Sequence, residues 1–353
     1  MAAANPNGGT GLREEVVSFA AGDGRALDLV HVRGAVAPAK PPVLLVHGAG
    51  VRANIFRAPV RRTVVDELVD AGYDVWLENW RASIDFTPME WTLDQAALYD
   101  HPRAVQTICE LTGSDEVKAV IHCQGSTSFM MSAVAGLVPQ VTTVVSNAVS
   151  LHPVVPWWSR VKLDYFIPVS RHLTRYANPH WGEKANTLFA KATEAMVRST
   201  HWECHNAVCK TVSFVYGSGR PALWRHENLD ETTHTWLNEE FGNAPMTFFS
   251  QMARCVRAGH LVSVEHHPEL PEDFTAGPPQ TDARFALICG ALNRCFLPDS
   301  QRRTFEFLER HQPGRHSLTV FPRYGHLDVF MGKDAAGDTF PAILRALEGK
   351  ASA

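Results

Sequence analysis

Short apolar segments alternate with amphipathic segments along this 353-residue chain, and this alternation restricts its possible folds more than any other feature. An apolar run with little polar alternation is typical of a strand buried on both faces, as in a parallel sheet covered by helices. Four such runs occur, at Pro42–Val46, Val117–His122, Val141–Ser146 and Phe285–Cys289. The pattern predicts an α/β fold with a mostly parallel sheet and helices on both of its faces.

Further segments extend this alternation toward both ends of the chain. More strands are predicted at Val16–Ala20, Ala26–Val32, Asp74–Leu77 and Ser317–Phe321, and the first two of these form a hairpin around a Gly-Asp-Gly turn. Helical spacing of apolar residues is found at Arg61–Ala71, Leu93–Leu111, Ser126–Ala135, Gln301–Glu309 and Ala336–Leu347. The acidic residues between Asp94 and Asp100 are expected on a solvated helix face.

Regular alternation stops between about His152 and Asp282, a stretch that holds six of the nine tryptophans and ten of the 17 histidines. This is too long for a simple loop. We therefore predict a core of residues 1–150 and 283–353, with a mainly helical cap, residues 151–282, inserted between the sixth and seventh core strands. Such a cap would cover the carboxyl ends of the strands, where α/β folds place ligands. Its aromatic side chains would either roof an apolar pocket or form the cap's own core.

Charge and composition argue against several classes of partner. The formal net charge is −4 and the chain has no run of Lys or Arg, which argues against nucleic acid. No stretch reaches the roughly 18 apolar residues of a membrane span. Met1–Glu15 lacks the apolar core of a signal peptide, so we expect a cytoplasmic protein whose seven cysteines are reduced thiols. The glycine patterns of nucleotide-binding loops are absent, and no cofactor and no metal site are expected.

The most informative local motif is Ala119–Ser126 (AVIHCQGS), in which a buried strand runs directly into a helix. A nucleophile elbow needs a sharp turn with the nucleophile at its apex and small residues around it. Cys123 takes the apex and Gly125 is the small residue two places on, whereas Ile121 stands where a glycine is usual. Because a helix N-terminus and a histidine both lower a thiol pKa, Cys123 is the predicted nucleophile. The alternative is a free cysteine buried at the end of a core strand.

Two other motifs would supply the rest of an acyl-transfer site. His47–Gly50 (HGAG) follows the first parallel-type strand, so the main-chain N–H groups of Ala49 and Gln124 are the predicted oxyanion hole. A tight glycine turn is the plainer interpretation of HGAG. His326 lies in Tyr324–Asp328, after the last strand, and is the predicted general base. A lone loop histidine is otherwise a solvated or capping residue.

The third catalytic residue, which accompanies the nucleophile and the histidine, departs from the usual pattern. An acid is expected in the loop after the strand Phe285–Cys289, but Asn293 stands there. Asn293 would orient His326 through a hydrogen bond, giving a Cys-His-Asn set. A Cys–His pair can ionise without a carboxylate, so a cysteine tolerates this change better than a serine does. Asp299 and Asp328 are the alternative acids, although Asp328 is better placed to brace the loop.

At this point the chain resembles the acid lipase family of α/β-hydrolases. The resemblance lies in Ala71–Leu77 (AGYDVWL), His122–Ser126 (HCQGS) and His326–Asp328 (HLD), and it spans both halves of the core but not the cap. The family's elbow has serine where this chain has Cys123. The cysteine elbow also resembles the α/β-hydrolase domains associated with sterol-oxidase-type flavin oxidoreductases, and that of polyhydroxyalkanoate synthases.

These resemblances imply an α/β-hydrolase fold and acyl chemistry on a small apolar substrate through an acyl-cysteine. Hydrolysis of an ester or thioester, as in an esterase, thioesterase or lipase-like enzyme, is the first expectation. An acyltransferase using the same acyl-cysteine is the second, and a non-catalytic relative that only binds ligands is the third.

A rival site is suggested by His201–Cys209 (HWECHNAVC), which brings His201, Cys204, His205 and Cys209 together in the sequence. Cys and His at such spacing could bind zinc. The segment lacks a Cys-x-x-Cys pair, and four residues at this spacing would not all converge from one helix. Ordinary packing within the cap, or a disulfide, is the alternative.

Overall fold

Eight strands form one sheet in the order β1-β2-β4-β3-β5-β6-β9-β10 in the computed structural model, which describes residues 11–349. The strands are β1 (Arg13–Ala20), β2 (Ala26–Arg33), β3 (Pro42–Val46), β4 (Asp74–Asn79), β5 (Val117–His122), β6 (Val141–Asn147), β9 (Arg284–Gly290) and β10 (Ser317–Phe321). Pairs β1–β2 and β2–β4 are antiparallel, and all the others are parallel. The predicted, mostly parallel sheet is confirmed. Most of Met1–Glu15, on which the signal-peptide prediction rests, lies outside the described residues.

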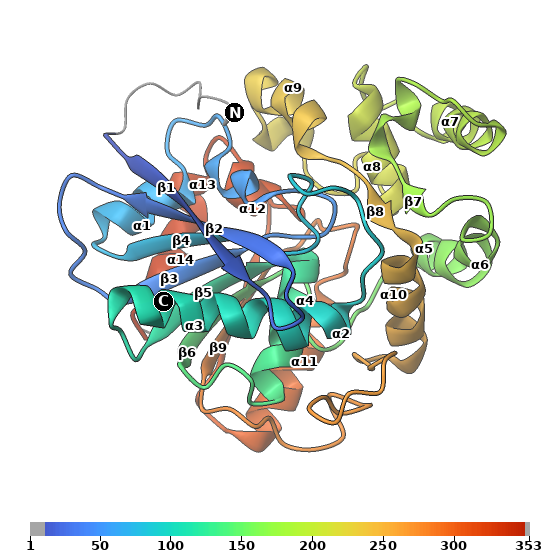
Figure 1. Cartoon of the computed structure of the whole chain (residues 1–353). Helices are drawn as coiled ribbons and strands as arrows, with labels where there is room; N and C mark the ends of the chain where they lie inside the picture. The colour runs from blue at the N-terminus through green and yellow to red at the C-terminus, as the bar shows by residue number, and fades with distance from the viewer. Residues whose placement is uncertain (1–10, 350–353) are drawn as a thin grey trace.

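Helices cover both faces of this sheet (Figure 1). Side chains alternate across β3: Leu44 and Val46 belong to one buried cluster, and Val43 and Leu45 to the other. Helices α3 (His101–Thr112), α4 (Cys123–Val134) and α11 (Asp299–His311) pack on the first face. Helices α1 (Val64–Asp70), α12 (Asp328–Met331), α13 (Ala335–Asp338) and α14 (Phe340–Leu347) pack on the second. Burial on two sides explains why the central strands are almost wholly apolar.

Several predicted helices begin at other residues in the structure, for local reasons. The helix predicted from Arg61 begins at Val64, because Thr63 caps it and exchanges hydrogen bonds with Asp66. The segment predicted as one helix from Leu93 consists of α2 (Leu93–Gln95), a π-helical turn η2 (Ala96–Asp100) and α3. The helix predicted from Ser126 begins at Cys123, directly after β5, so no linker separates strand and helix at the elbow.

The prediction of a solvated acidic face between Asp94 and Asp100 is wrong. Both carboxylates are fully buried. Asp100 pairs with Arg81 at 2.6 Å. Asp94 accepts hydrogen bonds from the Gln251 side chain and from the Val264 N–H. Buried carboxylates need such partners, and here the partners come from segments that sequence periodicity does not bring together.

The chain between β6 and β9 is mainly helical and gathers at one end of the sheet, at the right of Figure 1. Its elements are α5 (Trp157–Val161), η3 (Lys162–Phe166), α6 (Ile167–Ser170), β7 (Tyr176–Ala177), η4 (Pro179–Gly182), α7 (Leu188–Thr200), α8 (Ala207–Tyr216), η5 (His226–Asn228), α9 (Glu231–Glu240), β8 (Ala244–Pro245) and α10 (Met246–Ala258). The short strands β7 and β8 pair with each other, so the first and last parts of this segment are joined.

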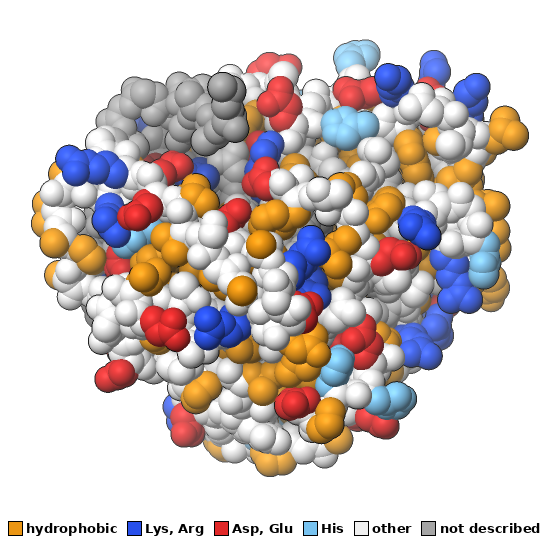
Figure 2. Space-filling model, in the orientation of Figure 1, with side chains coloured by type: hydrophobic (Ala, Val, Ile, Leu, Met, Phe, Trp, Pro, Cys, Tyr) orange, Lys and Arg blue, Asp and Glu red, His pale blue; other side chains and the backbone are white. Residues whose placement is uncertain are grey.

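The surface differs between the sheet and this helical segment. Lys, Arg, Asp and Glu side chains are interspersed over the face seen in Figure 2, and hydrophobic side chains reach the surface along its right edge. Of the eleven large hydrophobic side chains that are exposed among residues 11–349, eight lie between Trp157 and Trp202. No helix within residues 11–349 has both the length and the apolar character to cross a membrane.

Candidate active site

Cys123 lies at the turn between β5 and α4, in a backbone conformation that side chains rarely adopt. Its φ is +56°, whereas His122 before it is extended, with φ −135° and ψ 136°. A left-handed backbone at a residue other than glycine costs roughly 1–3 kcal/mol and persists only where the surroundings impose it. The turn directs the Cys123 side chain into the pocket bounded by the helices that follow β6. This is the geometry expected of a nucleophile elbow.

Close packing around the elbow explains the small residues beside it. A Cβ on Gly125 would lie 2.1 Å from the His47 carbonyl oxygen, and one on Gly48 would lie 2.9 Å from the Cys123 Cβ. The two glycines therefore let the HGAG loop approach the elbow. Ile121, which stands where a glycine is usual, is fully buried in β5 and pairs with Val46 and Ser146. The strand side of the turn thus accommodates a branched side chain.

His326 is brought to Cys123 by the loop after β10. Its ring is buried, and one of the two ring nitrogens lies within 4.8 Å of the Cys123 Sγ. The backbone is fixed on both sides: the His326 N–H donates to the Leu223 carbonyl at 3.0 Å, and its carbonyl accepts from the Asn147 side chain at 3.1 Å. The structure therefore places the predicted base beside the predicted nucleophile.

Asn293 also reaches His326, with its amide in a defined orientation. The Asn293 Oδ1 accepts from the Cys295 N–H at 2.9 Å and from the Phe296 N–H at 3.1 Å. These two bonds use both lone pairs of the oxygen, so Nδ2 is the atom that faces His326 Nδ1, at 3.1 Å. Because an amide nitrogen only donates, Nδ1 must accept, and the proton of the neutral ring sits on Nε2. A carboxylate at this position would instead accept a hydrogen bond from Nδ1–H.

The two alternative acids do not contact His326 in the structure. Asp299 lies at the start of α11, half-exposed, and pairs with Arg302 at 2.9 Å. Asp328 is buried, and it accepts from the Gly325 N–H at 2.8 Å and from Asn228 Nδ2 at 2.7 Å. Burial raises the pKa of Asp328 to about 6, against the lowering effect of these bonds. Asp328 therefore connects the loop to the segment around Asn228.

The surroundings of Cys123 favour its thiolate. Burial raises a thiol pKa, but the Cys295 side chain, His326 and the Gln124 N–H outweigh burial and hold the pKa of Cys123 well below its ordinary value. Burial and the neighbouring Cys123 raise the pKa of Cys295 well above its ordinary value, so Cys295 keeps its proton. That S–H also lies 3.1 Å from the Tyr216 carbonyl oxygen. The two thiols thus have opposite protonation preferences.

This pKa shift predicts that Cys123 stays reactive at mildly acidic pH. A free thiol loses about tenfold in thiolate, and hence in alkylation rate, for each pH unit below its pKa of about 8.5. For Cys123 the iodoacetamide rate should fall by less than about threefold between pH 8 and pH 6, because its thiolate persists there. The rate is measured on the peptide that contains Cys123, with glutathione as the reference thiol. A tenfold loss per pH unit would contradict the lowered pKa.

The predicted oxyanion donors lie on either side of Cys123. Ala49 lines the same small pocket as Cys123 and His326, and its N–H has no hydrogen-bond partner among residues 11–349. Gln124 is the second residue of α4, at the helix end where N–H groups lack intrahelical partners. Burial lowers the pKa of His47 to about 3, and the neutral ring contacts the Gly48 carbonyl at 2.6 Å, which fixes the loop that carries Ala49.

An apolar pocket opens from Cys123 into the helical segment. The aromatic side chains that line it are mainly phenylalanines rather than the tryptophans singled out in the sequence: Phe166, Phe189, Phe214, Phe248, Phe249, Phe296, Trp181 and Tyr216. Lys162 also lines it, and its Nζ donates to the Phe214 and Gly217 carbonyl oxygens. Burial lowers the pKa of Lys162 to about 8. Sequence reasoning missed Lys162, Tyr216 and Cys295, because no local motif marks them.

Within residues 11–349, two groups of side chains have the composition of a metal site. One is His122, Cys123 and His326, which coincides with the candidate catalytic residues. There, His122 Nδ1 lies 3.0 Å from Asn147 Nδ2, and burial lowers the pKa of His122 well below its ordinary value. The other group comes from the loop before α8, from α8, from η5 and from α9, and none of its residues lines the pocket.

Residues 41–197 match the family model described as the alpha/beta hydrolase fold. Lipase member K from Homo sapiens is 33% identical over 343 residues, which cover 89% of this chain and 81% of that protein. Sterol esterase 2 from Saccharomyces cerevisiae is 27% identical over 131 residues, or 32% of this chain and 24% of that protein. The chain thus spans most of the length of Lipase member K and about a quarter of the length of Sterol esterase 2.

Solved structures share the fold at low sequence identity. A thermophilic esterase from Thermogutta terrifontis aligns with a TM-score of 0.57 and 12% identity, covering 95% of this chain and 99% of that one. The epoxide hydrolase VrEH1 from Vigna radiata aligns with a TM-score of 0.57 and 15% identity, covering 95% of this chain and 98% of that one. At these identities the likeness establishes the architecture.

Proposed function

Since the chain belongs to the α/β-hydrolase family and is a hydrolase that acts on ester bonds, we propose that it works through an acyl-cysteine formed on Cys123. The observation that carries this proposal is the position of the Cys123 thiol. It lies at the apex of the elbow, with a lowered pKa, beside His326 and in the lining of an apolar pocket. Asn293 positions His326, and Ala49 and Gln124 supply the oxyanion hole.

In the first step the Cys123 thiolate attacks the acyl carbonyl carbon. A C–S bond forms, and the carbonyl electron pair moves to oxygen, where the Ala49 and Gln124 N–H groups stabilise the charge. The tetrahedral adduct then collapses, and the leaving group departs with its bonding electrons. In the second step water attacks the acyl-cysteine, gives a proton to His326 Nε2, and displaces the thiolate with release of the acid.

The orientation of Asn293 affects which substrates react well. Nδ1 of His326 faces the amide nitrogen of Asn293 rather than a carboxylate, so no hydrogen-bond acceptor stands at Nδ1 to stabilise a proton there. His326 therefore gives little help to a leaving group that must be protonated. A thiolate or phenolate departs without a proton, whereas an alkoxide does not. We propose that thioesters and activated esters react faster than simple alkyl esters.

The same orientation slows the second step, because His326 must carry its proton on Nδ1 to accept one from water. The acyl-cysteine would then persist long enough to meet another acceptor. This supports acyl transfer as a second candidate function. In that reaction an alcohol or amine, in place of water, attacks the acyl-cysteine.

We propose that residues 151–282 form a cap that binds the acyl chain. Six phenylalanines and Trp181 line the pocket, which suits an apolar chain. The exposed hydrophobic side chains between Trp157 and Trp202 add apolar surface on the same segment. All seven cysteines are unpaired, which suits a reducing compartment such as the cytoplasm.

Three substrates with one medium-length acyl group test this function: a p-nitrophenyl ester, an alkyl thioester and an ethyl ester. We expect a burst of p-nitrophenol of about one per chain and an acyl adduct on the Cys123 peptide. Turnover of the ethyl ester should be about 10²-fold slower, since it lacks general acid help. If transfer is the reaction, an added alcohol or amine acceptor should divert the acyl group from the free acid to the acylated acceptor. Absence of both adduct and turnover with all three substrates would leave only the ligand-binding interpretation.

A further inference from the structure

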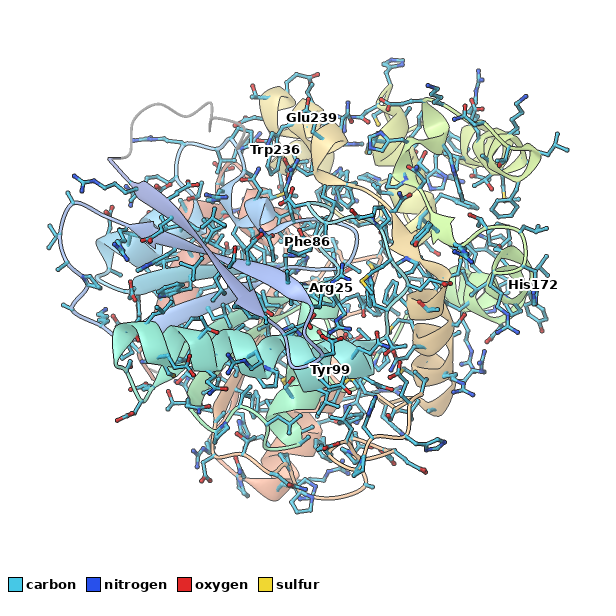
Figure 3. The ribbon with its side chains drawn as sticks, viewed as in Figure 1. Arg25, Phe86, Tyr99, His172, Trp236 and Glu239 are labelled. Atoms are coloured by element: carbon cyan, nitrogen blue, oxygen red, sulfur yellow. The ribbon has the colours of Figure 1, made fainter. Side chains whose placement is uncertain are left out.

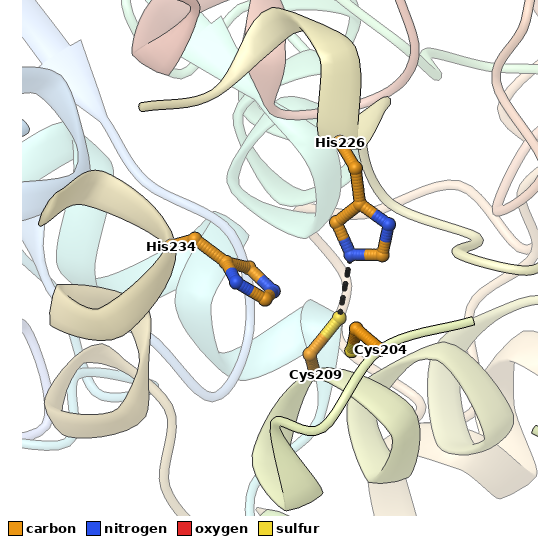
Figure 4. Close-up of side chains that lie close together, drawn as sticks. All are labelled: Cys204, Cys209, His226 and His234. Carbon is orange, nitrogen blue, oxygen red and sulfur yellow. Dashed lines mark hydrogen bonds between the residues drawn. The ribbon is translucent and has the colours of Figure 1, made fainter. Parts of the chain in front are cut away.

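Four side chains with metal-binding chemistry converge in the helical segment (Figure 4). One comes from the loop before α8, one from α8, one from η5 and one from α9. We call them the Cys₂His₂ cluster: Cys204, Cys209, His226 and His234. Their ligand atoms all lie within 4.8 Å of one another. The set combines the two cysteines of the sequence motif with two histidines that follow it by 17 or more residues.

We propose that the Cys₂His₂ cluster binds a structural zinc ion. Two thiolates and two imidazoles are a donor set typical of closed tetrahedral zinc sites. With Zn–S near 2.3 Å and Zn–N near 2.0 Å, a sulfur and a nitrogen on one tetrahedron stand about 3.5 Å apart. The Cys209 Sγ lies 3.4 Å from His226 Nε2, which matches that edge.

The cluster is held together by its own local structure. Asn206 caps α8 by accepting from the Cys209 N–H at 2.9 Å, and its Nδ2 donates to the His234 carbonyl at 3.1 Å. The rings of His226 and His234 lie 4.8 Å apart and nearly perpendicular, at 79°. The four donors therefore come from segments that are already fastened to one another.

One buried polar atom at the cluster lacks the partner that it requires. The His234 Nε2 is buried without a hydrogen bond among residues 11–349, whereas the partly buried Cys204 Sγ donates to the Asn206 carbonyl at 3.7 Å. A buried, unpaired polar group costs roughly 1–3 kcal/mol. Both cysteines are free rather than joined in a disulfide. A bound ion would give all four groups a partner at once.

The histidines expected from the sequence are not the ones that join the cysteines. His201 instead contacts the Thr200 hydroxyl at 2.9 Å and packs its ring against Phe214. His205 lies in the same loop as Cys204 and is not part of the cluster. His201 and His205 therefore do not join the cysteines, and His226 and His234 approach them from elements further along the chain.

The role of the ion is structural, because all four donors belong to side chains and none lines the pocket at Cys123. It would fasten α8 and η5 to α9, and α9 in turn is joined to the core by Arg52. The Arg52 guanidinium donates to the Glu239 carbonyl and to the Glu240 carboxylate, both at 2.9 Å. Figure 3 shows Glu239 and Trp236 on this helix.

The zinc site also lies next to the segment that supports His326. Leu223, three residues before His226, accepts from the His326 N–H at 3.0 Å, and Arg225 donates its N–H to Asp328 at 3.2 Å. Metal loss should therefore loosen the His326 loop as well as the cap.

The proposal is tested by measuring the zinc content of the full-length chain after purification without added metal or chelator. We expect about one zinc per chain by elemental mass spectrometry in the natural protein and in Cys123→Ala. We expect a loss to below about a tenth in Cys204→Ser and in His234→Ala. His205→Ala is the matched control, since it removes a neighbouring loop histidine and should keep its zinc.

Cobalt provides a second measurement that does not depend on stable variants. Protein stripped with a thiol-directed mercurial, then treated with Co²⁺ and reductant, should show thiolate-to-cobalt charge-transfer bands and the visible bands of tetrahedral cobalt. These bands should be unchanged in Cys123→Ala. A natural protein without zinc, which also fails to take up cobalt in a tetrahedral thiolate site, would overturn the proposal. So would zinc that is lost in Cys123→Ala and kept in His234→Ala.

Discussion

Replacement of Cys123 with alanine is expected to lower kcat/KM for a p-nitrophenyl ester by about 10³-fold or more, because the nucleophile is removed from an otherwise intact site. The acyl adduct should disappear from the intact mass spectrum at the same time. The fold should survive, since alanine is smaller than cysteine and introduces no clash at this buried position. Thermal unfolding of the variant checks that expectation.

Cys109→Ala is the matched control for this experiment. Cys109 is a free, partly exposed cysteine on α3, distant from the pocket, so its removal should change neither turnover nor adduct. If Cys123→Ala kept its turnover while the Cys109→Ala control behaved normally, the nucleophile would be another residue. Membership of the α/β-hydrolase family would still stand in that case.

Replacement of Asn293 with aspartate is expected to raise turnover of the ethyl ester by about 10²-fold. The aspartate would keep one oxygen for the Cys295 and Phe296 N–H groups, and its other oxygen would accept from His326 Nδ1. The ring proton then moves to Nδ1, so Nε2 is free to accept from water, and the imidazolium is stabilised. Activity toward the thioester should change far less, because its leaving group needs no proton.

The decisive measurement is whether Asn293→Asp accelerates the ethyl ester more than the thioester. Asn293→Ala, which removes the amide without adding a carboxylate, is the control and should not accelerate ethyl ester cleavage. The single variant Cys123→Ser should be nearly inactive. The double variant Cys123→Ser/Asn293→Asp should recover part of the activity, because a serine nucleophile depends on a general base. Equal acceleration of all three substrates by Asn293→Asp would contradict the proposed role of the amide.

Much of the architecture was predictable because it follows from local patterns. Runs such as Pro42–Val46 are apolar throughout because they are buried on both faces of a parallel sheet. The elbow was equally visible, since strand, turn and helix are contiguous from Ala119 to Ser126. The site residues Cys123, His326 and Asn293 come together in the structure, as their order along the fold suggested, and their catalytic roles stay predictions.

The features that the sequence could not provide depend on contacts between distant segments. The direction of the Asn293 amide is decided by two backbone N–H groups, not by residue type. Asp94 and Asp100 are buried because Gln251 and Arg81 reach them from elsewhere in the chain. His226 and His234 meet the cysteines through the packing of η5 and α9 against α8, which no spacing rule predicts.

The support of His326 by distant residues also has a consequence for biosynthesis. The elbow is complete once α4 has been made, but His326 lies on one of the last loops and is held there by Leu223, Asn147 and Asn293. A chain emerging from the ribosome from its N-terminus therefore carries the thiol long before its partner exists. Cys123, His326 and Asn293 can therefore meet only after β10 and the loop that follows it have been made.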